Sequence, residues 1–104
     1  MSKSPTSQID GADLIYVSTL VKVCEQAANY VEAVKKAKSA KLRLQEAYIQ
    51  WRSQTGNQHT DIDRNSREWI AMMGATKPEY RALLSAKARE RRAQAKLLRA
   101  VGGN

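Results

Sequence analysis

Apolar residues recur every three or four positions along the first half of the chain, as they do on one face of an amphipathic helix. Gly and Pro are both absent from residues 12 to 54, so nothing in that stretch breaks a helix. The pattern predicts one long helix over about 12–54, with a coiled-coil-like repeat that only Lys41 interrupts. Its two interleaved rows are Tyr16, Val23, Tyr30, Ala37, Leu44 and Trp51, and Leu20, Ala27, Val34, Lys41 and Tyr48.

The apolar face of this helix changes width near residue 35. Before it, further apolar side chains such as Val17, Val21 and Val31 widen the face, whereas Lys35 and Lys38 take their places after it. A broad face needs two or more neighbours to cover it, and a narrow one needs a single neighbour.

Two further helices are predicted after Gly56, whose freedom to adopt a left-handed backbone favours the end of the first helix there. Residues 65–68 (Asn-Ser-Arg-Glu) have the spacing of a capping box and begin a short helix over about 64–73, which Gly74 ends. Residues 76–79 (Thr-Lys-Pro-Glu) form a second such box, so a basic helix is expected over about 77–101. The predicted fold class is therefore all-α, a helical hairpin or three-helix bundle.

The length of 104 residues fits one domain, expected over residues 10–104, with residues 1–9 as a flexible tail and Asp10 as a helix cap. A chain this short buries a modest fraction of its surface, so oligomerisation is expected to stabilise it. Two arrangements stay open: the long helix remains straight, or it bends near residues 37–40 and folds on itself.

Positive charge is concentrated in two blocks. The chain has a net charge of +8, with a surplus of basic residues in 35–52 and 77–104 and a small acidic surplus elsewhere. An antiparallel third helix, ending near residue 35, would bring both blocks into one surface that suits an anion such as nucleic acid. The alternative is two separate solvated faces. The residues expected to contact phosphates are Lys35, Lys36, Lys38, Lys41, Arg43, Arg81, Lys87, Arg89, Arg91, Arg92, Lys96 and Arg99.

The same antiparallel packing leaves the broad apolar face of residues 14–34 without a cover. Exposed apolar patches of this size are typical of interfaces, so we expect a homodimer through this segment. A larger protein as partner and a compact bundle are the alternatives. The expected interface consists of Leu14, Tyr16, Val17, Leu20, Val21, Val23, Cys24, Ala27, Tyr30 and Val31.

The residues with reactive side chains do not form a catalytic or metal-binding motif. Cys24 is the single cysteine, expected as a small core residue in a cytoplasmic protein without disulfides. His59 lies with Asp61 and Asp63 in a polar stretch, where solvation and helix capping explain it. We therefore expect no enzyme activity, metal, cofactor or small-molecule substrate. The longest uncharged apolar run, 14–21, is too short to span a bilayer, so no membrane association is expected.

Two motifs bear on nucleic-acid recognition. Residues 70–83 weakly resemble a helix-turn-helix, although the gap before Gly74 is one residue short. The aromatic side chains that could stack on bases are expected to pack instead where the three helices meet. They are Tyr48, Trp51, Trp69 and Tyr80.

These patterns favour a small, basic, non-enzymatic protein that binds nucleic acid through cations of the first and third helices. A protein-binding adaptor or inhibitor is the alternative, which would dock its hairpin on a larger, possibly nucleic-acid-processing, protein. The size and charge are typical of phage and plasmid accessory proteins.

Overall fold

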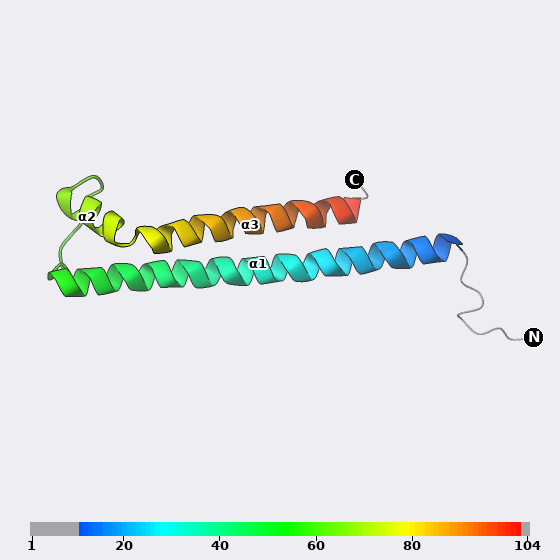
Figure 1. Cartoon of the computed structure of the whole chain (residues 1–104), viewed down its shortest axis with the longest axis horizontal. Coiled ribbons are helices and arrows are strands. Elements are labelled where there is room, and N and C mark those ends of the chain that lie inside the picture. Colours follow the sequence, from blue (N-terminus) through cyan, green and yellow to red (C-terminus); the bar gives the residue numbers. More distant parts are fainter. Residues whose placement is uncertain (1–10, 103–104) are drawn as a thin grey trace, which may run out of the picture.

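A computed structural model describes residues 11–102 of the chain as three helices: α1 (Gly11–Thr55), α2 (Arg67–Ala75) and α3 (Lys77–Gly102). Helix α3 runs back along α1, and the short α2 caps the closed end of this hairpin (Figure 1). The all-α fold class is confirmed. The expected N-terminal tail and the cap expected at Asp10 lie outside the described residues.

Helix α1 is continuous over 45 residues, or about 68 Å at 1.5 Å per residue. It passes through residues 37–40 without a break, so the predicted alternative of a helix folded on itself there is wrong (Figure 1). Gly56 ends the helix with φ of 75°, and the Asn57 N–H donates to the Arg52 carbonyl at 2.8 Å. This is the Schellman arrangement, in which a left-handed residue lets the chain satisfy the last carbonyls of a helix.

The loop after α1 folds back on the end of that helix. The Arg52 guanidinium donates to the carbonyl of Thr60 at 3.0 Å, which ties the loop to the last turn. Helix α2 then starts at Arg67 because the Ser66 hydroxyl accepts a hydrogen bond from the Trp69 N–H at 3.2 Å. The prediction of Asn65 as cap was one residue early: Asn65 has a left-handed backbone instead, and Gly74 lies inside α2.

Thr76 alone separates α2 from α3, and it is 2% exposed. Its N–H and its hydroxyl both donate back to the Met72 carbonyl, at 3.0 and 2.8 Å. The predicted forward capping box at residues 76–79 is therefore wrong, because Thr76 closes α2. One linking residue also leaves no room for the three- to four-residue turn of a helix-turn-helix.

Two helical rows that are rich in alanine bring α1 and α3 together. On α1, the row centred on Ala37 is buried or half-buried, and Ala33 and Ala40 are buried beside it. On α3 the facing row includes Leu83 and Ala86, which pack with Ala40 in one cluster. We call the α1 positions the covered row: Val23, Gln26, Tyr30, Ala33, Ala37, Ala40, Leu44, Ala47 and Trp51.

The covered row corrects half of the predicted repeat. The heptad positions from Val23 to Trp51 were right. The interleaved row was right in part: Ala27, Val34 and Tyr48 are half-buried, and Tyr48 packs on the core cluster. Leu20 and Lys41 are exposed, and the buried positions in the middle of the helix are Ala33 and Ala40, one residue before Val34 and Lys41. Lys41 is therefore no defect in the repeat, because it lies outside the contact and is exposed.

The core of the hairpin is small. Within residues 11–102 the buried hydrophobic side chains are six, and three of them are alanines. Since a buried alanine removes little apolar surface from water, the hairpin gains modest stability from its own packing. Small residues in the contact also allow two helix axes to approach closely.

Helix α3 runs antiparallel to α1 and stops short of the N-terminal turns of α1 (Figure 1). Lys96 lines the same groove as Gln26 and α3 continues to Gly102, so α3 covers α1 beyond residue 26, whereas it was expected to end near residue 35. The first turns of α1 extend past the end of α3 (Figure 1).

Candidate nucleic-acid interface

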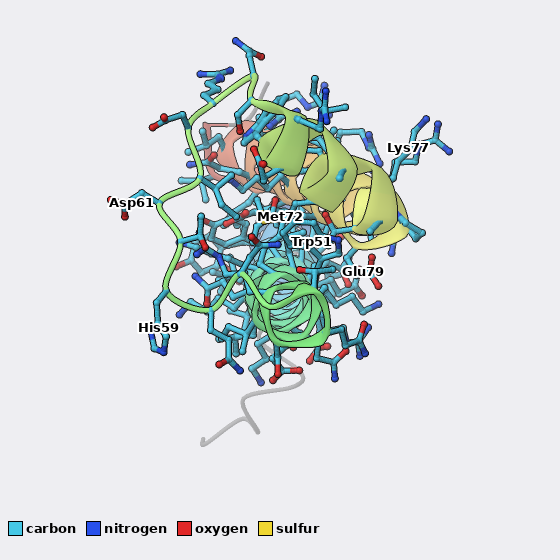
Figure 2. The ribbon with its side chains drawn as sticks, turned by 90° about the vertical axis from the view of Figure 1, so that its left-hand side faces the viewer. Trp51, His59, Asp61, Met72, Lys77 and Glu79 are labelled. Carbon is cyan, nitrogen blue, oxygen red and sulfur yellow. The ribbon has the colours of Figure 1, made fainter. Side chains whose placement is uncertain are left out.

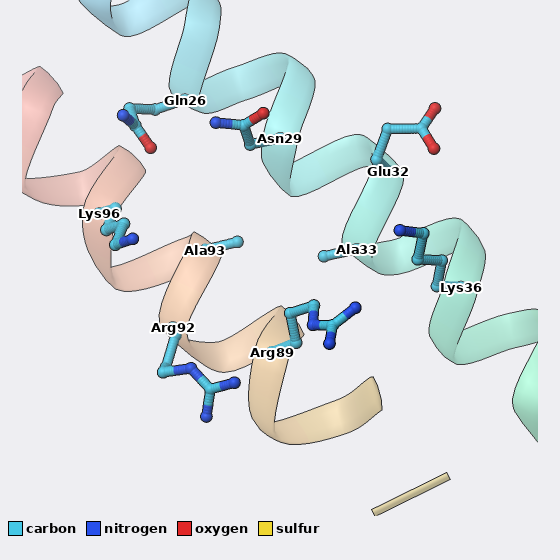
Figure 3. Close-up of a pocket in the computed structure, with 9 residues that line it drawn as sticks. All are labelled: Gln26, Asn29, Glu32, Ala33, Lys36, Arg89, Arg92, Ala93 and Lys96. Carbon is cyan, nitrogen blue, oxygen red and sulfur yellow. The ribbon is translucent and has the colours of Figure 1, made fainter. Parts of the chain in front are cut away.

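A groove runs along one side of the hairpin, between α1 and α3. It consists of two adjoining hollows of about 350 and 560 Å³, which share Glu32, Lys36 and Arg89 in their walls. Ala33 of α1 and Ala93 of α3 point toward each other across the groove (Figure 3). Because these side chains end at Cβ, the longer side chains at the edges can lean over a bound group.

Six cations line this cationic groove. On α3 they recur at spacings of three and four residues, which places them on one helical face. Arg89 extends from α3 toward α1, and Lys36 approaches from the other wall (Figure 3). All six side chains are exposed. They are Lys35, Lys36 and Arg43 from α1, and Arg89, Arg92 and Lys96 from α3.

Acidic residues balance this charge weakly. Glu32 is the one carboxylate among the residues that line the two hollows, and it points away from α3 (Figure 3). Like charges gathered on two facing helices destabilise the hairpin and raise the local positive potential. An anion that bound between the helices would relieve that repulsion.

The other predicted cations lie elsewhere on the surface. Lys38 is two residues past Lys36, or about 200° around the helix, and it lines a shallow apolar hollow with Lys41 and Leu42. The structure therefore gathers half of the twelve predicted residues around the groove. The remaining four are exposed on α3 and line neither hollow: Arg81, Lys87, Arg91 and Arg99.

Polar groove residues were missed by the sequence analysis. The Gln26 and Asn29 amides line one hollow, and Ser39 lines the other. Amide and hydroxyl groups donate hydrogen bonds to phosphate oxygens, so all three suit a phosphate backbone. A repeat read through Gln26, Ala33 and Ala40 would have placed these neighbours at the edge of the contact.

The four aromatic side chains expected to pack where the helices meet lie at the closed end of the hairpin, and none of them lines the groove. The Tyr48 hydroxyl donates to the Met73 sulfur at 3.7 Å, next to Thr76 and Tyr80. Partial burial, together with electrostatic repulsion from the ionisable Tyr80 hydroxyl, raises the pKa of Tyr48 above 10.0, although a hydrogen bond with Thr76 acts in the opposite direction. Trp51 and Trp69 are half-buried.

The ten residues of the predicted interface divide into two groups. Val23, Ala27 and Tyr30 are half-buried. The other seven are exposed, among them Cys24, so the expectation that Cys24 is a core residue is wrong. The reason is that Cys24 lies on the side of α1 that faces away from α3. The seven are Leu14, Tyr16, Val17, Leu20, Val21, Cys24 and Val31.

His59, Asp61 and Asp63 are exposed in the loop between α1 and α2. The His59 and Asp61 side chains point outward from the helices (Figure 2). No group of three or more His, Cys, Asp or Glu residues within the described part of the chain is arranged to hold a metal ion.

None of the helices in residues 11–102 combines the length and the apolar character needed to cross a lipid bilayer.

Comparisons of the chain with known protein families, with curated proteins and with solved structures gave no match.

Proposed function

We propose that this is a non-enzymatic, cytoplasmic protein that binds the phosphate backbone of nucleic acid in the cationic groove. The observation that supports this proposal is the groove itself: six exposed cations from two helices line two adjoining hollows that contain a single carboxylate. Lysine and arginine bind phosphates through charge and hydrogen bonds, and the release of counterions drives the association.

A duplex fits the groove better than a single strand. Proteins that bind single strands stack bases on aromatic side chains, and none of the residues that line the two hollows is aromatic. From Gln26 to Arg43 the groove extends along about 26 Å of helix, and a duplex of that length has about 15 phosphates on its two strands, of which those on the facing side can reach the groove. Contacts of this kind do not read base sequence, so we expect binding without strong sequence preference.

The test compares two sets of charge reversals. Lys36→Glu, Arg89→Glu and Lys96→Glu together change the groove, whereas Lys38→Glu, Lys41→Glu and Arg91→Glu change cations outside it. Both triple variants replace two lysines and one arginine, so their net charges are equal. The readout is the fluorescence anisotropy of a labelled DNA duplex and an RNA duplex, with circular dichroism to verify that helicity is kept.

We expect the groove variant to bind at least about a hundredfold more weakly, and the matched control to lose less than about tenfold. Equal losses in both variants would contradict a role for the groove and would indicate attraction by net charge alone. Full affinity of the groove variant would exclude the proposal.

Docking of the hairpin on a larger protein is the second candidate function. The same six cations suit an acidic surface, and the exposed apolar side chains of α1 offer contact area. In a pull-down after nuclease treatment, one stoichiometric protein that the groove variant fails to retain would favour this function.

A further inference from the structure

A second apolar row lies on α1, opposite the covered row. Ala28 is nine residues from Ala37, which places it about 180° around the helix. Residues spaced by three and four on this side are all exposed, including Val21 at 51%. We call them the free row: Leu14, Val17, Val21, Cys24, Ala28 and Val31.

We infer that the free row pairs with the free row of a second copy of this chain, antiparallel, to form a two-fold dimer. The row has the 3-4 spacing of a coiled-coil contact and no charged member. An α-helix that exposes such a row over more than two heptads has an unsatisfied apolar face on this chain alone.

The spacing of the apolar residues in the free row determines how the α1 helices of the two copies are aligned. If Val21 lies opposite the second copy's Cys24, then Leu14 lies opposite its Val31 and Val17 opposite its Ala28. Each apolar residue thus meets an apolar residue, and the pairing is identical when the two copies are exchanged. Leu20 and Ala27 extend the contact on one flank.

The positions of two lysines limit how far the α1 helices of the two copies can overlap. The next positions of the row after Val31 are Lys35 and Lys38. In the stated register Lys35 and Lys38 lie opposite residues 10 and 7 of the second copy, which precede its free row. A longer overlap would bury these lysines against an apolar surface, which costs free energy unless they are paired.

Charge also favours the antiparallel orientation over the parallel one. Residues 11–34 contain Asp13, Lys22, Glu25 and Glu32, so the overlapping segment has a small negative charge. The basic grooves of the two copies then lie toward opposite ends of the dimer. A parallel pair would place Lys35 and Lys38 beside the same residues of the second copy, where like charges repel.

The first test measures mass by light scattering and sedimentation as a function of concentration. The full-length chain should reach twice 11.6 kDa, and Val21→Asp should remain monomeric because the pairing would bury two uncompensated carboxylates. Thr19→Asp makes the same charge change on the opposite side of α1 and should still dimerise. A monomeric wild-type chain, or a Val21→Asp variant that dimerises like Thr19→Asp, would overturn the inference.

The second test measures orientation. In a Cys24→Ala background, Ser39→Cys provides one site for a spin label on each copy. The antiparallel register separates the two sites by 33 helical residues, or about 50 Å, whereas a parallel pair places them within about 20 Å. A short distance would overturn the antiparallel arrangement. Neither test involves nucleic acid, so their failure is distinct from failure of the proposed function.

Discussion

The two sides of α1 differ in how the chain uses them. The covered row is rich in alanine and packs against α3, whereas the free row contains valine and leucine and faces solvent. Small side chains around Ala37 let α1 and α3 approach closely, and the apolar side chains of the free row stay exposed on the hairpin.

The two ends of α1 differ in charge as well. Beside α3, six cations gather around a groove, whereas the segment before residue 35 has a small negative charge. The two proposals therefore concern different parts of α1, and we expect substitutions in the groove to leave self-association intact and substitutions in the free row to leave nucleic-acid binding intact.

The largest expected difference between the two sides of α1 concerns two leucines. Leu44 is 6% exposed in the contact with Leu83, and Leu42 is 59% exposed. Leu44→Ala should lower the free energy of unfolding by about 2–5 kcal/mol because it leaves a cavity. Leu42→Ala should change it by less than about 0.5 kcal/mol. Urea denaturation followed by circular dichroism measures both, and equal effects would show that α3 does not pack on this row.

A smaller effect is expected where alanine allows close packing. Ala33 is 4% exposed and faces Ala93, so Ala33→Leu should destabilise the hairpin by about 1–3 kcal/mol through overpacking. Ala95 is exposed on α3, and Ala95→Leu serves as the control with little change expected. If Ala33→Leu stabilised the protein, the two helices would have room for a larger side chain and the close contact would be wrong.

The sequence predicted the ends of the helices well where one residue determines the backbone conformation. Gly56 ends α1 through its left-handed backbone, and Pro78 lies in the first turn of α3, where a missing N–H costs nothing. Capping was harder to predict, because Asn65 and Ser66 are both good caps and only the fold of the loop selects Ser66.

The sequence predicted only some of the residues in the covered row, for a related reason. Val34 and Ala33 are both apolar neighbours, and hydrophobicity favours valine. Ala33 is buried and Val34 is half-buried, and which of the two lies deeper depends on how closely α3 approaches, which is a property of the pair of helices. The groove has the same origin, since Arg89 and Lys36 face each other only once the register between α1 and α3 is known.

The dependence of duplex affinity on salt tests the central proposal most directly. If the six groove cations each neutralise about one phosphate, the logarithm of the binding constant should fall with the logarithm of salt concentration with a slope of about −5. Affinity should then drop by about a thousandfold between 50 and 200 mM salt, with a shallower slope for the groove variant. A binding constant that stays the same across this range, or no measurable binding at low salt, would contradict the account.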